Sequence, residues 1–231
     1  MKGKQVLLTG GTGGLGLGVT LAVLAQDAEV TISYRNPKEV ERLKHNLPPA
    51  DFERIHFIPA NLEEEASVEN LINRIGRVDV LIHLVGGFSI GKIHEYSFFD
   101  WKHEFDINLN TTFLTCKYSL KSMWQHGYGR IVTVASKAAL EPAGQLGAYS
   151  AAKAGVVALT KAIADETKGT DITANVVLPS VIDTPTNREA MGTENADSWV
   201  KPESLAQLIC FLASQAAKDI RGAAIPIYGN L

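Results

Sequence analysis

The sequence predicts a single α/β domain, residues 1–231, in which a parallel sheet of seven strands is covered by helices on both faces. Strand-like apolar segments alternate with helical segments along the whole chain. Several strand-like segments are continuous runs rich in valine and isoleucine, which is typical of strands buried on both faces of a parallel sheet. No linker, low-complexity segment or longer repeat divides the chain. Together these observations predict three layers, a doubly wound sheet and right-handed crossovers.

Hydrophobic periodicity and turn residues define the order of the elements. The predicted strands are residues 5–9, 29–33, 54–58, 80–84, 129–135, 172–178 and 224–227. The predicted helices are residues 15–26, 37–45, 64–75, 98–125, 148–167 and 202–214. The least regular stretch, 183–200, contains Pro185 and Gly192 and is mostly polar. Because long loops near the carboxyl ends of strands often cover binding sites, we expect this stretch to form a lid.

Composition argues against several classes of protein. Apolar residues make up 45% of the chain and charged residues 20%, so a sizeable core is expected and disorder is not. The formal net charge is -3 without a basic stripe, which argues against nucleic-acid binding. Cys116 and Cys210 give no disulfide framework and no metal spacing, so we expect two buried apolar thiols and no metal site. With no signal peptide before the first strand and no membrane-spanning run, we expect a cytoplasmic protein.

A glycine-rich turn follows the first predicted strand, with the pattern Thr-Gly-x-x-x-Gly-x-Gly formed by Thr9, Gly10, Gly14 and Gly16. Glycine permits positive φ, lets the backbone approach a pyrophosphate and lets the following helix pack against the strand. The start of that helix offers free N–H groups to an anion. The turn therefore predicts a Rossmann-type dinucleotide site; a P-loop is excluded because no Gly-Lys-Ser/Thr sequence follows.

Four polar residues form a candidate catalytic set. Tyr149 and Lys153 are four residues apart in a predicted helix, so both side chains lie on one face. Ser136 follows a predicted strand, at the edge of the sheet where active sites of this architecture lie. Asn108 stands in the long helix upstream. In order and spacing, and behind this glycine turn, the four residues resemble the tetrad of the short-chain dehydrogenase/reductase family.

The resemblance covers almost the whole chain and is nearest to carbonyl reductases and 3-oxoacyl-acyl-carrier-protein reductases. It implies hydride transfer between a nicotinamide, NAD(P)(H), and a carbonyl/alcohol substrate. In that family role Tyr149 is the general acid or base, and Ser136 binds the substrate oxygen. Lys153 would bond the nicotinamide ribose, and Asn108 would support a water chain. The Lys153 ammonium is also expected to lower the pKa of Tyr149 from its free value of about 10, a shift of about three units being worth roughly 4 kcal/mol.

The identity of the nicotinamide cofactor depends on the end of the second strand. That place holds Arg35, and no acidic residue occurs between Glu29 and Glu39. An arginine can pair with the 2′-phosphate, whereas a carboxylate there would hold the free 2′-hydroxyl. We therefore expect NADP(H) rather than NAD(H). Gly13 departs from this expectation, because many NADP-preferring relatives carry a basic residue there.

Further cofactor contacts follow from the resemblance. The expected residues are Thr12, Leu15, Asn61, Leu62, Gly86, Pro179, Val181 and Thr184, together with Tyr149 and Lys153. Ser180 replaces a glycine that is usual in the family, which leaves the local backbone shape open. His83 stands where an asparagine is usual; we interpret it as a hydrogen-bonded structural histidine, with a role as a site acid left as the alternative.

Other predictions stay broader. The resemblance implies a homodimer or homotetramer formed through the long helices that carry Asn108 and Lys153. We interpret the aromatic residues of 98–105 as helix packing. Gly86, Gly87 and Phe88 slightly resemble dihydropteridine reductase-like members, and a non-catalytic NADP-binding redox sensor is a further alternative. The loops that set substrate specificity are idiosyncratic, so the sequence does not identify the substrate.

Overall fold

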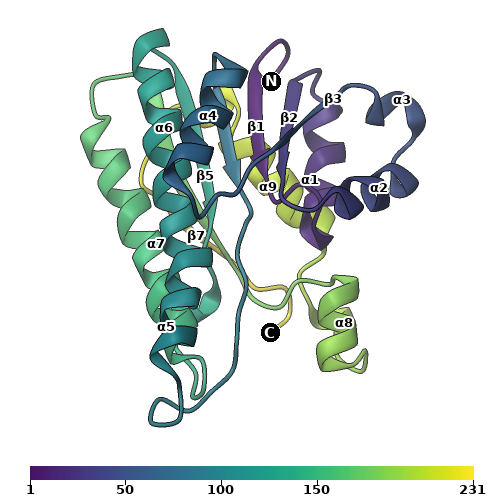
Figure 1. The fold of residues 1–231 in the computed structure, drawn as a ribbon, viewed down its shortest axis with the longest axis vertical. Coiled ribbons are helices and arrows are strands. Elements are labelled where there is room, and N and C mark those ends of the chain that lie inside the picture. The colour runs from purple at the N-terminus through teal and green to yellow at the C-terminus, as the bar shows by residue number, and fades with distance from the viewer.

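Seven parallel strands form one sheet in the order β3-β2-β1-β4-β5-β6-β7 in the computed structural model, which describes residues 1–231 (Figure 1). The strands are β1 (Gln5–Thr9), β2 (Glu29–Tyr34), β3 (Ile55–Pro59), β4 (Val80–His83), β5 (Gly129–Val134), β6 (Ile172–Pro179) and β7 (Ala224–Ile227). All seven agree with the predicted strands to within one residue at each end. The strand order reverses beside β1, so the carboxyl ends of β1 and β4 form the place where ligands bind in doubly wound sheets.

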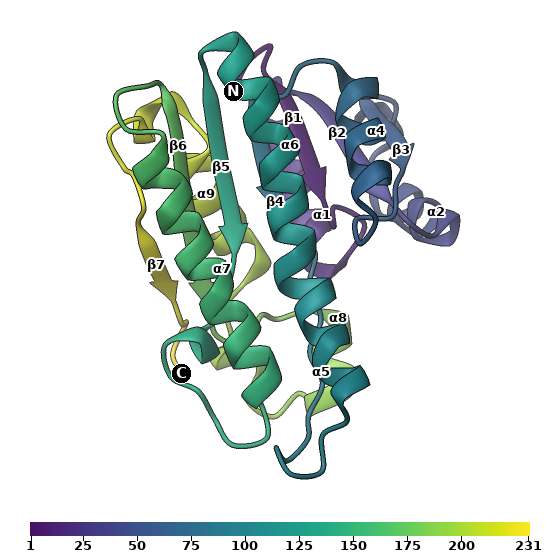
Figure 2. The same ribbon diagram turned by 60° about the vertical axis from the view of Figure 1, so that its left-hand side comes forward.

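Nine α-helices surround this sheet. They are α1 (Gly14–Leu24), α2 (Pro37–Asn46), α3 (Pro49–Phe52), α4 (Glu65–Ile75), α5 (Phe98–Phe105), α6 (Thr111–His126), α7 (Gly147–Glu166), α8 (Pro185–Met191) and α9 (Pro202–Leu212). Helices α4, α6 and α7 cover one face of the sheet, and α1 and α9 cover the other (Figure 2). Helices α5 and α8 extend beyond the carboxyl edge of the strands (Figures 1 and 2). None of these helices has the length and apolar character that a membrane span requires.

Each face of the sheet has its own hydrophobic core. Leu8 belongs to the core under α1 and α9, whereas its neighbour Leu7 belongs to the core under α4, α6 and α7. Both side chains are fully buried, which explains why the strands are continuously apolar. Burying one such leucine contributes roughly 1.5–3 kcal/mol. Cys116 and Cys210 are free and lie in these cores as predicted, and burial raises the pKa of the Cys116 thiol to about 12.

The single helix predicted for residues 98–125 is interrupted. A π-helical turn, Asp106–Asn110, separates α5 from α6. A π-turn adds one residue to the helical repeat, and such turns occur mostly at functional sites. Here the extra residue lets the fully buried Asn108 side chain point back toward the segment after β4, where it bonds both backbone groups of Gly87. The hydrophobic pattern cannot reveal this interruption because it continues across it.

The predicted lid contains a helix that periodicity did not identify. The Thr184 hydroxyl accepts a hydrogen bond from the N–H of Asn187 and caps the start of α8. Pro185 occupies the first turn, where its missing N–H is not needed, and Gly192 ends the helix with φ of +78°. Asp183 accepts hydrogen bonds from Arg188 and Lys201, which lower the pKa of its carboxyl. These contacts fix both ends of the segment.

The aromatic residues of α5 do not all pack inside the chain, contrary to the prediction. Trp101 and Phe105 do pack together, with ring centres 4.8 Å apart. Phe98 and Phe99, however, are 75% and 80% exposed. They occupy the first turn of a helix that projects past the sheet, so no core lies beneath them.

The contacts of His83 are those of a structural histidine, because its ring lies among threonine hydroxyls inside the protein. Its imidazole lies within hydrogen-bond distance of the hydroxyls of Thr9, Thr111 and Thr115, at 2.8, 3.4 and 3.2 Å. It therefore joins the ends of β1 and β4 to α6. Complete burial, followed by the nearby Lys153 ammonium, lowers its pKa to about 3. The ring is neutral at ordinary pH, which agrees with the structural interpretation rather than with a site acid.

This burial predicts a pH dependence of stability. An unfolded histidine takes up a proton near pH 6.5, whereas folded His83 stays neutral down to about pH 3. Stability should therefore be complete above pH 6.5 and be lost as pH falls, at up to about 1.4 kcal/mol per pH unit. His83→Asn should show a shallower decline of the unfolding free energy in denaturant titrations. The exposed-site control His45→Asn should keep the wild-type slope, and equal slopes for both variants would contradict the interpretation.

Candidate active site and nucleotide-binding pocket

The glycine-rich turn joins β1 to α1 at the carboxyl edge of the sheet. Gly10 has φ of +72°, a left-handed conformation that favours glycine. A Cβ at Gly16 would lie 2.4 Å from the carbonyl oxygen of Gly10, so α1 can approach the turn this closely only with glycine there. The start of α1 has no side-chain cap. Its N–H groups are therefore available to an anion such as a pyrophosphate.

A cavity of about 240 Å³ lies beside this turn, with walls from the ends of β1 to β4. Six of the predicted cofactor residues line it, namely Gly10, Thr12, Arg35, Asn61, Leu62 and Gly86. Gly14, Leu15 and Gly16 lie at the start of α1 beside it, whereas Pro179, Val181 and Thr184 lie at and beyond the end of β6. The cavity therefore accounts for six of the fourteen predicted cofactor residues.

Two arginines and two glutamates share this cavity. Arg35 is paired with Glu63 at 3.1 Å. On the opposite wall the Thr12 hydroxyl donates 2.9 Å to Glu39, and Arg42 donates 3.1 Å to the Thr12 carbonyl oxygen. Sequence reasoning identified only Arg35. Glu63, which follows β3, was missed because it meets Arg35 only when β2 and β3 lie side by side. The two residues of α2 were missed because their side chains reach the cavity only once α2 is folded against the turn.

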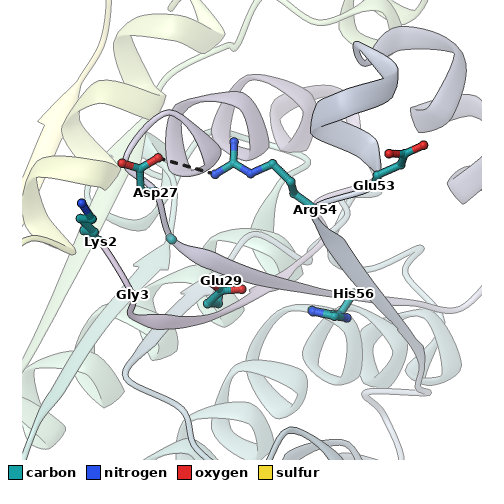
Figure 3. Close-up of a pocket in the computed structure, with 8 residues that line it drawn as sticks. Lys2, Gly3, Asp27, Glu29, Glu53, Arg54 and His56 are labelled. Atoms are coloured by element: carbon teal, nitrogen blue, oxygen red, sulfur yellow. Dashed lines mark ion pairs between the residues drawn. The ribbon is translucent and has the colours of Figure 1, made fainter.

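A second cavity lies elsewhere. It measures about 450 Å³ and is lined mainly by charged residues at the amino ends of β1 to β3 (Figure 3). Figure 3 shows Arg54 reaching toward Asp27, an ion pair of 3.9 Å, while Lys2 and Glu29 lie around the opening. None of the predicted site residues is among its lining. It lies at the opposite end of the strands from the glycine turn and therefore takes no part in the nucleotide site.

Ser136, Tyr149 and Lys153 gather where β5 ends and α7 begins. Lys153 Nζ donates 3.0 Å to the carbonyl oxygen of Val134, the last residue of β5. The same nitrogen lies 5.8 Å from the centre of the Tyr149 ring, as expected for side chains on one helix face. The Ser136 hydroxyl accepts 3.2 Å from the N–H of Ala138. The Phe88 ring packs edge-on against Tyr149, with ring centres 6.1 Å apart.

Gly86 connects this cluster to the nucleotide cavity that it lines. A Cβ at Gly86 would lie 2.7 Å from Asn108 Oδ1 and 2.9 Å from Lys153 Nζ. The absence of a side chain therefore lets both polar groups approach the backbone at the end of β4. Asn108 Nδ2 donates to the carbonyl oxygen of Gly87 at 2.9 Å and to the Glu104 carboxylate at 3.1 Å. All four predicted catalytic residues thus lie around the adjacent ends of β4 and β5.

Burial dominates the acid–base properties of the cluster. It raises the pKa of the Tyr149 phenol above its ordinary value of 10; the Ser136 hydroxyl opposes this effect and the Glu104 carboxylate adds to it. The predicted lowering of this pKa by Lys153 is therefore wrong for the protein by itself, because lost hydration destabilises the phenolate. Burial also lowers the pKa of Lys153 to about 8, an effect that Glu104 partly offsets.

Glu104 is the residue of this site that sequence reasoning missed. It is only 2% exposed, and its carboxylate accepts 2.6 Å from the Ser89 hydroxyl as well as the bond from Asn108. The signal was available in the spacing. Trp101, Glu104 and Asn108 lie three and four residues apart, so a charged residue stood on the inward face of the predicted helix.

The segment after β6 reaches back to the turn. A Cβ at Gly14 would lie 2.9 Å from the Thr184 Cβ, so Thr184 packs directly on the start of α1. Ser180 keeps a backbone without positive φ, and its hydroxyl donates 2.7 Å to the carbonyl oxygen of Tyr228. This bond ties the segment to the end of β7, which explains how serine is accommodated where glycine was expected.

Known proteins share both the fold and the sequence pattern. The family model described as short chain dehydrogenase matches residues 4–195. D-beta-hydroxybutyrate dehydrogenase of Cupriavidus necator is 31% identical over 96% of this chain and 95% of its own length. The FabG 3-oxoacyl-acyl-carrier-protein reductase of Chlamydia pneumoniae is 28% identical over 99% of this chain and 97% of its own length. A solved structure titled ElxO with NADP bound has a TM-score of 0.92 and 29% identity, covering 99% of this chain and 98% of that one.

The doubly wound parallel sheet with its glycine turn defines a Rossmann-type nucleotide-binding protein. Because the family model spans most of the sequence, the chain belongs to the short-chain dehydrogenase/reductase family. It is an oxidoreductase of that family, and the resemblance first identified from its motifs is confirmed.

The close approach at Gly16 gives a direct test of the turn. Gly16→Ala should push α1 away from Gly10, reduce stability by about 1–3 kcal/mol and weaken NADPH binding at least about tenfold. Thermal unfolding and calorimetric titration would measure the two effects. Gly144→Ala is the matched control, because a Cβ there has no neighbour within 4 Å. Wild-type NADPH affinity in Gly16→Ala would show that the turn does not hold the dinucleotide.

Proposed function

We propose that this protein is an NADP(H)-preferring reductase or dehydrogenase that transfers a hydride between nicotinamide and a carbonyl/alcohol substrate. The observation that carries the proposal is the convergence of Ser136, Tyr149, Lys153 and Asn108 at the ends of β4 and β5, beside the nucleotide cavity. A half-buried phenol and hydroxyl beside a buried ammonium, next to a dinucleotide pocket, suit carbonyl reduction better than any other chemistry available to these residues.

The residues present fit a nicotinamide dinucleotide. The turn at Gly10 and Gly16 forms a cradle that a Cβ would fill, and free N–H groups at the start of α1 would hold the pyrophosphate. Asn61, Leu62 and Gly86 would hold the adenosine part. Tyr149, Lys153, Pro179, Val181 and Thr184 would hold the nicotinamide half. A bound nicotinamide supplies or accepts the hydride, and its oxidised ring adds positive charge to the site.

Tyr149 is the proton donor in this proposal. With its pKa raised by burial, the phenol is protonated at neutral pH, which is the form a general acid needs for reduction. Ser136 would donate a hydrogen bond to the substrate oxygen and stabilise the negative charge that develops there. In oxidation, Tyr149 would act in reverse as the general base.

Lys153 and Asn108 would assist Tyr149 by stabilising its phenolate and by supporting the return of its proton. The Lys153 ammonium, fixed on the Val134 carbonyl, would bond the nicotinamide ribose and stabilise a transient phenolate. Asn108 bonds the Gly87 backbone and lies near Lys153, and it would support the water chain that restores the proton.

The substrate is proposed only as a small carbonyl or alcohol. The walls of a substrate site would come from 87–96, 138–146 and the lid. A dihydropteridine reductase-like activity remains the alternative substrate class. A redox sensor without turnover is disfavoured because a sensor needs no proton donor. We further propose a cytoplasmic homodimer or homotetramer that contacts neither nucleic acid nor membrane.

The proton donor is tested by Tyr149→Phe, assayed with a panel of ketones and aldehydes. Loss of the phenol should reduce kcat/KM about 10²–10⁴-fold, as expected for one general acid, with little change in NADPH affinity. Tyr128→Phe, placed just before β5 at the other end of the sheet, is the matched control and should keep full activity. Full turnover in Tyr149→Phe would overturn the mechanism.

The cofactor preference is tested at the Arg35–Glu63 pair. Arg35→Gln should weaken NADPH binding by about tenfold or more while leaving NADH nearly unchanged, because only NADPH carries the 2′-phosphate. Glu63→Gln frees Arg35 from its carboxylate partner and should strengthen NADPH binding. Dissociation constants from cofactor fluorescence would measure both. A wild-type preference for NADH that Arg35→Gln does not alter would contradict the NADP(H) assignment.

A further inference from the structure

The buried charges of the molecule fall into two groups. Four charged side chains, apart from histidine, are buried: Asp79, Glu104, Arg130 and Lys153. Asp79 pairs with Arg77 at 2.8 Å, and Arg130 pairs with Asp171 at 2.7 Å, both near the amino ends of the strands. Glu104 and Lys153 have no ion-pair partner within 4 Å, and both lie at the carboxyl edge. Because an isolated buried charge is costly, these two opposite charges call for a joint explanation.

Polar contacts of Asn108 connect the surroundings of Glu104 with those of Lys153. The Glu104 carboxylate accepts 3.1 Å from Asn108 Nδ2, and Asn108 Oδ1 and Lys153 Nζ both approach Gly86. Helix α5, which carries Glu104, packs against α7, which carries Lys153. The Asn108 amide thus bonds the carboxylate and lies near the ammonium, while the two charges make no direct ion pair, which leaves the ammonium free to bond other groups.

We propose that Glu104 is a positioning residue that acts as the counter-charge of Lys153 and, through Asn108, sets the proton affinity of the catalytic cluster. This inference rests on the proposed function. Glu104 would then support the four predicted catalytic residues through a carboxylate that contacts neither cofactor nor substrate. Its other oxygen is held by Ser89, whose hydroxyl also contacts that of Tyr96, so the carboxylate is fixed from two sides.

The groups around Lys153 leave Glu104 as the main source of negative charge. The titratable side chains that face Lys153 are Tyr149 on its own helix, His83 at the end of β4, and Glu104 on α5. His83 stays neutral because burial holds its pKa at about 3, and Tyr149 stays protonated. Removing the Glu104 charge should therefore lower the pKa of Lys153, and that of Tyr149 with it.

Glu104→Gln removes the charge but keeps the size and hydrogen-bonding shape of the side chain. The first readout is the titration of Lys153 in the ligand-free protein, followed by NMR of carbon-labelled lysine side chains and assigned with Lys153→Met. We expect the midpoint to fall about one pH unit below that of the wild type. The second readout is the alkaline limb of kcat/KM for carbonyl reduction, which should move to lower pH by a similar amount.

Three further variants complete the test. Glu166→Gln removes an exposed carboxylate from the last residue of α7, more than three helical turns beyond Lys153, and should leave both readouts unchanged. Glu104→Asp restores the charge and should return the Lys153 midpoint toward the wild-type value. Glu104→Leu removes charge and hydrogen bonds together and should lose stability as well. An unchanged Lys153 midpoint in Glu104→Gln would overturn the inference, because it would show that the Glu104 charge does not act on Lys153. A Glu104 with a purely structural role would tolerate glutamine, and only leucine in its place would lower the stability.

The same experiments separate this inference from the proposed function. The NMR titration needs neither cofactor nor turnover, so it tests the counter-charge even if no carbonyl substrate is found. If Tyr149→Phe stays fully active, the proposed mechanism fails whatever the titration gives. If Tyr149→Phe is inactive but the Lys153 midpoint of Glu104→Gln does not move, only the role of Glu104 fails.

Discussion

The burial of one ammonium group is the constraint around which the carboxyl edge of this sheet is organised. Lys153 is only 5% exposed and bonds the last carbonyl of β5. That position requires a glycine at Gly86, because any side chain there would collide with the ammonium. It also requires nearby polar groups to compensate for the lost hydration, which Asn108 and Glu104 provide across the π-turn. The π-turn, the glycine at position 86 and the buried Glu104 carboxylate can thus all be explained by the burial of the Lys153 charge.

The sequence predicts those features whose cause is local. Apolar segments, several of them continuous runs, identify every strand, and the fixed geometry of a parallel sheet then brings all carboxyl ends to one edge. The glycine turn is equally predictable from the sequence, because the positive φ at Gly10 and the close contact of Gly16 with Gly10 both arise within a few residues. The spacing of Tyr149 and Lys153 settles their common face by helix geometry alone. For these reasons the fold and the arrangement of the four polar residues were predictable.

What the sequence does not predict depends on contacts between distant segments. The π-turn at Asn108 exists because Gly87, twenty-one positions earlier, offers both backbone groups to its amide. Arg42 and Glu39 enter the nucleotide cavity only through the packing of α2 on the turn. The acidity of Tyr149 depends on burial, which no residue spacing reveals, and the expected direction was wrong. Phe98 and Phe99 lack a core beneath them because α5 projects beyond the sheet.

The contact between Thr184 and Gly14 has a structural consequence. It joins the N-cap residue of α8 to the first turn of α1, so the predicted lid packs on the same backbone that would face the pyrophosphate. Any displacement of α8 therefore has to shift the residue that caps it against the start of α1. Under the proposed function, a change of conformation in this segment would be felt at the backbone that is expected to hold the pyrophosphate.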